Sequence, residues 1–155
     1  MRKAHTIASI LVITLLLGLL LATGLANVGH GSCTGNGACY LNTGDVGSGS
    51  CNGDSPCYLN TGPVGHGSCN GDSACAYNAG TIGSNSCNEV AGAEYACSGN
   101  SNTGTIRTNS CNAQDACSNN TGTIGTNSCN AELACFNNTR TIGNNQCNTP
   151  GECRQ

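Results

Sequence analysis

The sequence of 155 residues contains no tryptophan and one phenylalanine, and aromatic residues make up only 3% of it. Charged residues are also scarce, at 8%. After residue 26, Leu, Ile, Val and Phe occupy only 12 of 129 positions, far below the roughly 20% under which a chain fails to build an ordinary apolar core. The low charge argues equally against charged disorder. This composition disfavours a conventional globular enzyme domain.

Positive charge is the second shortage. No lysine follows residue 3, and three arginines oppose eight acidic residues after residue 26, which leaves a net charge of −5 there. A weakly acidic surface without basic clusters predicts neither nucleic acid nor an anionic membrane as a partner. The sequence also lacks a nucleophile–base pattern and a phosphate-binding loop, so we predict a protein that is not an enzyme and has no catalytic residues.

The first 26 residues are typical of an export signal. Arg2 and Lys3 precede an apolar run over residues 7–21, and Gly24 and Ala26 provide small side chains at a cleavage site after Ala26. An uncleaved membrane anchor is the alternative, although the run is short for a membrane span. We therefore expect a signal peptide at 1–26 and a secreted, extracellular or cell-surface domain at 27–155 that does not contact the membrane after cleavage.

What the chain has in abundance is cysteine. All 14 cysteines follow residue 26 and make up about 11% of the mature part, which is typical of a disulfide scaffold. They mark a repeat of 18 residues, extended to 24 in the fourth unit, whose units begin at Cys33, Cys51, Cys69, Cys87, Cys111, Cys129 and Cys147. Each unit has one branched apolar residue, and these residues form the isoleucine column: Val28, Val46, Val64, Ile82, Ile106, Ile124 and Ile142.

A unit with one large apolar residue cannot bury a face alone, so the repeats must stack to make an interior. Gly, Asn, Ser and Thr dominate, and no helical spacing of apolar residues follows residue 26. The predicted fold is all-β, a single β-solenoid of about seven 18-residue coils with one disulfide per coil. Strands about 4.8 Å apart make such a rod roughly 30 Å long. A second column, Asn42, Asn60, Asn78, Asn102, Asn120 and Asn138, is expected to form hydrogen bonds up the stack.

Two disulfide schemes are open. Pairing between coils leaves one cysteine over in each column, because seven is odd. Pairing within coils uses all 14 and requires turns in the enclosed segments, which are rich in turn residues. We favour the second scheme, with the pairs Cys33–Cys39, Cys51–Cys57, Cys69–Cys75, Cys87–Cys97, Cys111–Cys117, Cys129–Cys135 and Cys147–Cys153.

The C-x5-C spacing in each coil of a Ser- and Thr-rich repeat resembles the disulfide-braced antifreeze β-helices of beetles. Ser and Asn flank the first cysteine here, where that family has Thr, and the period is 18 rather than 12. The segments Ile-Gly-Ser-Asn-Ser and Ile-Gly-Thr-Asn-Ser also resemble the hexapeptide repeat of left-handed β-helices. The first resemblance implies an ice-binding face, and the second implies a triangular cross-section.

Three surfaces are candidates for function. A Thr-x-Thr pattern offers a face for ice or another surface, at Thr103, Thr105, Thr121, Thr123, Thr139 and Thr141. The insertion in the fourth unit offers a loop contact through Val90 and Tyr95. Stacked Asp54 and Asp72 could hold calcium, the one cofactor considered. The alternatives are strand-favouring threonines, a tolerated loop and solvated turn acids.

The repeat starts near the predicted cleavage site and shows no atypical capping unit at either end. Open edges of this kind predict head-to-tail association of identical copies, which builds filaments. Our leading hypothesis is therefore a secreted structural protein that forms extracellular fibres or a surface layer. An ice-binding protein and an adhesin-like binding module are the alternatives.

Overall fold

The computed structural model of the protein describes residues 26–89, 94–101 and 103–154. Within these ranges the chain forms no helix, and its strands are β1 (Thr81–Ile82), β2 (Thr105–Ile106) and β3 (Thr123–Ile124). They form one parallel sheet in the order β1-β2-β3. The described chain is therefore all-β. It contains no helix that is long and apolar enough to span a membrane.

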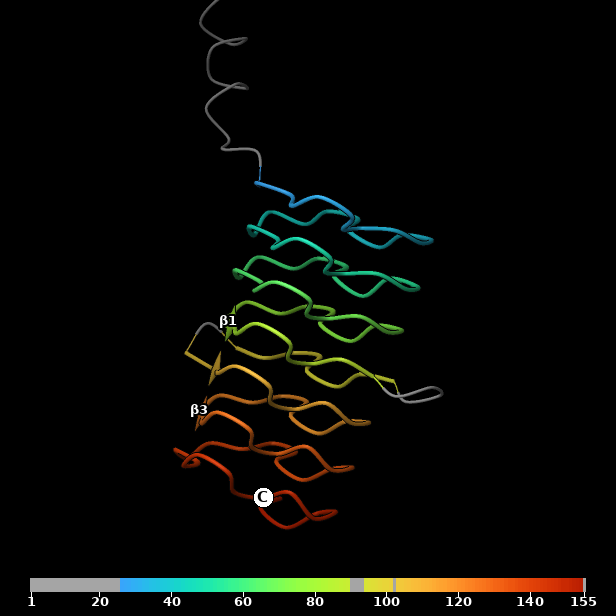
Figure 1. The fold of residues 1–155 in the computed structure, drawn as a ribbon. Helices are drawn as coiled ribbons and strands as arrows, with labels where there is room; N and C mark the ends of the chain where they lie inside the picture. Colours follow the sequence, from blue (N-terminus) through green and yellow to red (C-terminus); the bar gives the residue numbers. More distant parts are fainter. Residues whose placement is uncertain (1–25, 90–93, 102, 155) are drawn as a thin grey trace, which may run out of the picture.

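Successive repeats lie one on the next from the N-terminal to the C-terminal end (Figure 1). Residues 18 positions apart are neighbours in the stack, so that Ile106 lies opposite Ile124 in the sheet. The N–H of Cys51 donates to the carbonyl of Ser68 at 3.0 Å, and this bond recurs in later repeats. Isolated parallel bridges extend the isoleucine column beyond the sheet, at Val28–Val46, Val46–Val64, Val64–Ile82 and Ile124–Ile142.

The strands are short because left-handed residues interrupt each repeat. The first cysteine of every repeat has a positive φ, between 55° and 60°. Two positions before it the chain again turns left-handed, with glycine in the early repeats and Asn85, Asn109, Asn127 and Asn145 later. Glycine and asparagine adopt this conformation most readily. The abundance of these two residues therefore follows from the turns that close each repeat.

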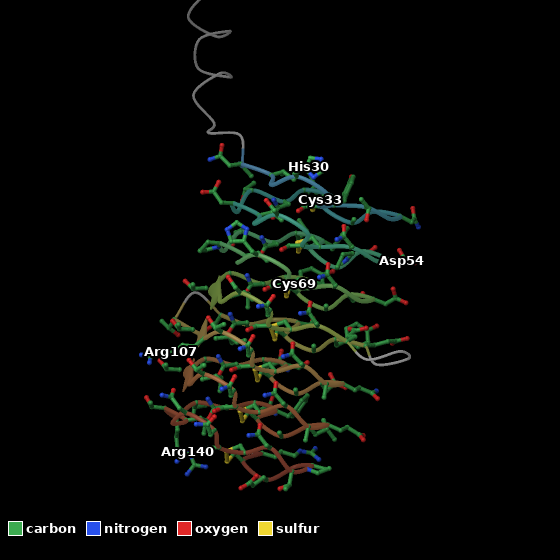
Figure 2. All side chains as sticks on the ribbon, viewed as in Figure 1. His30, Cys33, Asp54, Cys69, Arg107 and Arg140 are labelled. Carbon is green, nitrogen blue, oxygen red and sulfur yellow. A yellow bond between two sulfur atoms is a disulfide. The ribbon has the colours of Figure 1, made fainter. Side chains whose placement is uncertain are left out.

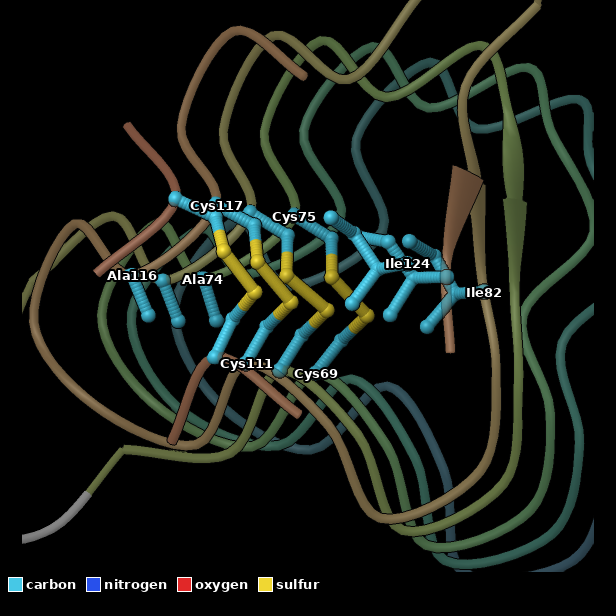
Figure 3. Close-up of a cluster of buried hydrophobic side chains, with 14 of the residues drawn as sticks. Cys69, Ala74, Cys75, Ile82, Cys111, Ala116, Cys117 and Ile124 are labelled. Atoms are coloured by element: carbon cyan, nitrogen blue, oxygen red, sulfur yellow. A yellow bond between two sulfur atoms is a disulfide. The ribbon is translucent and has the colours of Figure 1, made fainter. Parts of the chain in front are cut away.

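Seven disulfides join cysteines of the same repeat, with Cα atoms 5.4–5.7 Å apart. These are the pairs of the within-coil scheme, and no cysteine of the described chain is free. Figure 3 shows the bridges as a row through the interior, with Ile82 and Ile124 on one side and Ala74 and Ala116 on the other. In these repeats each bridge therefore separates a small lobe that contains alanine from a larger lobe that contains isoleucine.

The sulfur row forms the centre of the core. Every cysteine from Cys51 to Cys135 is fully buried, and Ile82, Ile106 and Ile124 are at most 2% exposed. A closed loop of this size stabilises the folded state by about 2–3 kcal/mol in the chain-entropy account. Disulfides therefore occupy the centre of the core, which in a larger domain consists of packed aliphatic side chains.

A buried asparagine ladder runs beside the isoleucine column. Each side-chain amide donates to the amide oxygen of the preceding repeat at 2.6–2.9 Å, through Asn42, Asn60, Asn78, Asn100, Asn120 and Asn138. Asn100 takes the place in this column that was predicted for Asn102, and Asn102 itself lies outside the described residues. The two extra residues follow Asn100 instead of preceding it: Ser101 donates its N–H to the carbonyl of Asn120, as Thr121 does to Asn138.

A serine ladder precedes the first cysteine of each repeat. The hydroxyl of Ser50 donates to the carbonyl of Gly65 at 2.8 Å and accepts the N–H of Ser68 at 3.1 Å. Ser68, Ser86, Ser110 and Ser128 repeat this pair of bonds. Buried hydroxyls and amides are thus satisfied between repeats, which makes a polar interior tolerable.

In the fourth repeat the described residues stop at Glu89 and resume at Glu94, on either side of the four-residue insertion. The N–H of Glu89 donates to Asn70 at 3.0 Å, and Glu94 forms a parallel bridge with Asp72. The stack therefore resumes at Glu94 in register with the third repeat. Val90, which was predicted to contact a partner, lies outside the described residues.

Candidate functional site

The first repeat presents an edge of free backbone donors. The N–H groups of Gly31, Gly35, Gly37, Cys39 and Leu41 make no hydrogen bond within the part of the chain that the structure describes. In the second repeat the equivalent groups donate to the first repeat at 2.9–3.0 Å, from Gly49, Gly53, Ser55, Cys57 and Leu59. The first repeat therefore carries the donors of a ladder whose acceptors are not in the described chain.

The last repeats present the complementary edge. The carbonyls of Asn144, Pro150, Glu152 and Arg154 accept no hydrogen bond from residues of the three described ranges. One repeat earlier, the equivalent carbonyls of Thr126, Glu132 and Ala134 accept from Asn145, Gly151 and Cys153 at 2.8–3.0 Å. The backbone ladder therefore presents open carbonyl acceptors at this edge and open N–H donors at the edge of the first repeat.

The C-terminal edge also carries a partial cap, which the sequence analysis missed. Gln146 stands where every earlier repeat has serine, and its side-chain oxygen accepts the N–H of Gly143 at 2.9 Å. In the preceding repeat the equivalent donor, Gly125, bonds to Ile142 of the next repeat. The glutamine therefore replaces a bond that a further repeat would make. The departure from serine in the repeat pattern was the available signal.

Two further side chains distinguish the end repeats. Glu152 accepts the N–H and the hydroxyl of Thr149 at 3.1 and 3.0 Å, within the final turn. At the other end, Thr34 stands where all later repeats have asparagine. The later asparagines bond back to the preceding repeat, as Asn52 does to Thr34 and Gly31. Both end repeats thus depart from the pattern at positions that bond between repeats.

The structure brings Thr105, Thr123 and Thr141 into one column with Thr81. Thr81, Thr105 and Thr123 are in register in the sheet, and the Ile124–Ile142 bridge places Thr141 next. These side chains are exposed or half-buried. This threonine column gives one line of regularly spaced hydroxyl and methyl groups along the sheet.

The other predicted threonines are arranged less regularly. Thr121 and Thr139 occupy a second line two residues before the threonine column, but Ser101 takes that place in the fourth repeat. Thr103 is out of register, and its hydroxyl donates to the carbonyl of Thr121 at 3.1 Å. The predicted Thr103-x-Thr105 pair therefore does not repeat the geometry of Thr121 and Thr123, because the two-residue insertion displaces Thr103.

The acidic turns lie on the side of the stack opposite Arg107 and Arg140, as the position of Asp54 in Figure 2 shows. The N–H of Asp54 donates to the carboxylate of Asp72 at 3.0 Å. Within the described residues, no three acidic side chains converge; the one group with metal-ligand spacing consists of the bridged Cys129, Cys135 and Cys147. The Asp72 carboxylate therefore links two repeats, and calcium binding at these turns stays a prediction.

Glu89, beside the insertion of the fourth repeat, has a raised pKa. Burial raises the pKa of Glu89 to about 7, with smaller contributions from the Asp72 and Glu94 carboxylates, against hydrogen bonds from the N–H groups of Asp72 and Ala96. One carboxylate oxygen accepts the Asp72 N–H at 2.9 Å, and the other is buried without a hydrogen bond. Below about pH 7 the protonated carboxyl group is therefore favoured, because burial penalises the charged form.

Tyr95, the described member of the predicted loop contact, is 44% exposed. It lies beside Tyr58 and Tyr77 at an open pocket on the edge of the stack. The structure therefore places Tyr95 next to tyrosines of the preceding repeats, although they are 18 or more positions away in the sequence.

Comparison with known proteins gives a family without an assigned activity. The family model described as a domain of unknown function, DUF7640, matches residues 21–116. No curated protein and no solved structure matches the chain. The resemblances to antifreeze and hexapeptide-repeat proteins therefore remain predictions, whereas the seven bridges indicate an oxidising compartment. Since the match covers more than half of the sequence, the chain belongs to the DUF7640 family.

Proposed function

We propose that the protein is a secreted, non-enzymatic structural protein, a disulfide-stapled β-solenoid rod that assembles end to end into extracellular fibres or a surface layer. Its disulfides and buried ladders support a rigid rod. The open backbone N–H groups of its first repeat and the open carbonyls of its last repeat support self-association.

The observation that carries the proposal is the match between the two edges. Stacking the first repeat of one copy on the last repeat of another aligns Gly31 with Asn144, Gly37 with Pro150 and Cys39 with Glu152. In each pair an N–H meets a carbonyl, as in the bonds from Gly49 to His30 or from Ser55 to Asn36 within the chain. The junction thus continues the internal ladder.

Gln146 moderates this junction. Its side-chain oxygen accepts the N–H of Gly143, which in a continuous stack would instead donate to the carbonyl of Val28 of the next copy. Joining exchanges one hydrogen bond for another, so this bond contributes little net free energy, and the open carbonyls provide the gain. The cap protects a free end from non-specific edge pairing without blocking the specific junction.

The contact is heterologous, since different surfaces meet at each end, and such a contact extends into a filament when it does not close into a ring. It also requires a free N-terminal edge. Removal of the predicted signal peptide would therefore free this edge and allow assembly outside the cell.

Two substitutions that restore the internal pattern test the proposal. Gln146→Ser introduces the serine of the earlier repeats, and Thr34→Asn introduces the asparagine of the later ones. Each supplies bonds that only a neighbouring copy can complete, so each should lower the concentration at which the oxidised, untagged chain 27–155 forms filaments. Sedimentation velocity and negative-stain micrographs measure this. Asn36→Ala is the matched control, because its side chain lies on the same edge but outside the serine line and the asparagine line that these two substitutions extend.

The double variant provides the decisive result. If Thr34→Asn with Gln146→Ser remains monomeric at millimolar concentration, while its circular dichroism matches the parent, the edges do not join and the proposal is wrong. Filaments that form equally well from chains with a bulky tag fused ahead of residue 27 would also contradict it, because the tag obstructs the donor edge.

The threonine column favours ice binding as a second candidate function. Thr81, Thr105, Thr123 and Thr141 repeat at the spacing of a parallel sheet, which is the arrangement that can order water on a flat face. Thermal hysteresis and inhibition of ice recrystallisation would be measured on the monomer. Thr123→Tyr should abolish both activities, and Thr103→Tyr, outside the column, should retain them. Absence of hysteresis in the parent protein excludes this function.

A further inference from the structure

All four tyrosines of the chain gather on one edge of the stack. Tyr40 and Tyr58 stack with ring centroids 5.6 Å apart and planes 12° apart. Tyr77 meets Tyr58 edge-on at the same distance, and Tyr95 continues the row beside them. We call these four residues the tyrosine strip.

The strip is exposed in a protein that otherwise exposes few large apolar groups. Tyr40, Tyr77 and Tyr95 are 57%, 59% and 44% exposed. Together with Leu41 they account for four of the five exposed large apolar residues of the described chain. Packing alone does not require these rings, because other repeats have serine, asparagine or aspartate at the equivalent positions. Such a concentration of exposed aromatic surface is typical of an interaction site.

The strip contains an open pocket of about 300 Å³. Three tyrosines line it, and small side chains fill the rest: Ser55, Ser73, Ala76 and Ser98. The Ser55 hydroxyl lies 3.3 Å from the Asp54 carboxylate, and the Ser98 hydroxyl donates to the carbonyl of Ala76. The lining has rings and hydroxyls but no charged side chain, so it complements a neutral ligand with both apolar and hydroxyl faces.

We propose that this pocket binds a neutral oligosaccharide. A hexopyranose ring presents C–H groups to an aromatic ring and hydroxyls to its neighbours, and Tyr77, Tyr95 and the serines provide both kinds of partner. The strip runs along the stack, so further sugar units of a chain can follow it toward Tyr40. The site is lateral and independent of the edges that join copies, so it would attach a rod or filament to a glycan surface.

A second copy of the chain fits the strip less well. A row one or two side chains wide over four repeats, about 4.8 Å each, offers on the order of 200 Å², whereas a stable protein interface buries about 800 Å² on each partner. In the fifth repeat the edge is polar, with Ser118 and Asn119, and in the sixth it carries Leu133 and Phe136 but no tyrosine. The concave, uncharged lining therefore favours a small neutral ligand.

The absence of tryptophan makes the test direct, because all tyrosine fluorescence of the chain comes from this strip. Oxidised chain 27–155 would be titrated with cellotetraose, chitotetraose and laminaritetraose, with calorimetry as a second readout. Tyr77→Asn and Tyr95→Ser place residues that the repeat already accepts there, since Asn119 and Ser73 have the same left-handed backbone. Phe136→Ser, in the column of Tyr58 but outside the strip, is the control.

We expect saturable binding of at least one oligosaccharide, weakened about tenfold by Tyr77→Asn and by Tyr95→Ser and unchanged by Phe136→Ser. No saturable binding of any of the three probes overturns the inference, and so does equal binding by all variants. Loss of side-by-side association in the strip variants, without glycan binding, would identify the strip as a contact between copies instead.

Discussion

The first four repeats and the last three share one interior but differ at the surface. In both halves a disulfide separates a buried alanine from a buried branched residue, as with Ala74 and Ile82 or Ala116 and Ile124 (Figure 3). On one edge, Tyr40, Tyr58 and Tyr77 of the first half give way to serine and asparagine in the fifth repeat. Along the sheet, Asp45 and Pro63 of early repeats give way to threonine later.

This difference shows where the chain is free to vary. An interior position is repeated because each side chain must bond or pack against its copy in the neighbouring repeat, as the asparagine ladder does. A surface position meets only solvent on its outer side. Divergence along a single column therefore directs attention to the tyrosine strip of the first four repeats and to the threonine column, which begins at Thr81 in the third repeat and continues into the last three.

Removal of an internal disulfide should have the largest effect on stability. Changing both cysteines to alanine at Cys111–Cys117 should lower the free energy of unfolding by about 2–4 kcal/mol, because a short closed loop and a buried contact are lost together. The Cys69–Cys75 pair should cost the same within about 1 kcal/mol if the interiors are equivalent. Urea unfolding followed by circular dichroism measures both. A large difference between the two pairs would contradict the shared interior.

The asparagine ladder should give the next largest effect. Asn120→Ala removes the acceptor of Asn138 and the donor to Asn100, so buried amide groups remain unsatisfied, at a cost of about 2–3 kcal/mol. Asn78→Ala should cost as much in the first half. Asn36→Ala, exposed and outside the ladder, should change stability by less than about 0.5 kcal/mol. Equal, small effects at all three sites would show that the ladder does not stabilise the stack.

The smallest expected difference between the two halves is in how the stability of the protein depends on pH, through Glu89 of the fourth repeat. Glu89 has a pKa of about 7 in the folded chain against an ordinary value of 4.5, so the folded state holds more protons between these values. The contribution of Glu89 to stability is then greatest below pH 4.5 and falls as pH rises to about 7, by on the order of 1 kcal/mol for a partly exposed group. Melting temperatures at pH 5 and 8 measure this.

Glu89→Gln should remove that pH difference and raise stability at pH 8, because a neutral amide avoids the cost of burying a charge. The last three repeats have Ala113, Ala131 and Thr149 at this position, so they offer no comparable group. A pH dependence that survives Glu89→Gln would mean that another carboxylate is responsible.

The sequence predicts those features of the fold that depend on the period alone. The isoleucine column follows from the repeat spacing, and the structure shows it. The pairing of Cys51 with Cys57 belongs to the favoured one of two open schemes, and the structure contains this bridge. The fourth repeat was misaligned at Asn102, because the sequence alone does not show whether the two extra residues precede or follow the asparagine of the ladder. Gln146 was visible as a departure from serine, but only the structure shows that its side-chain oxygen accepts the N–H of Gly143.

By itself the amino-acid sequence determined that this protein is a repeated, cross-linked β structure for an oxidising compartment, because cysteine spacing, glycine and asparagine turns and the lack of aliphatic residues leave few other ways to bury a core. Only the tertiary structure decided which surface residues meet. Tyr58, Tyr77 and Tyr95 are 18 or more positions apart in the chain but share one pocket. Stacking in parallel register brings equivalent positions to neighbouring distances, and that step converts a periodic sequence into a site.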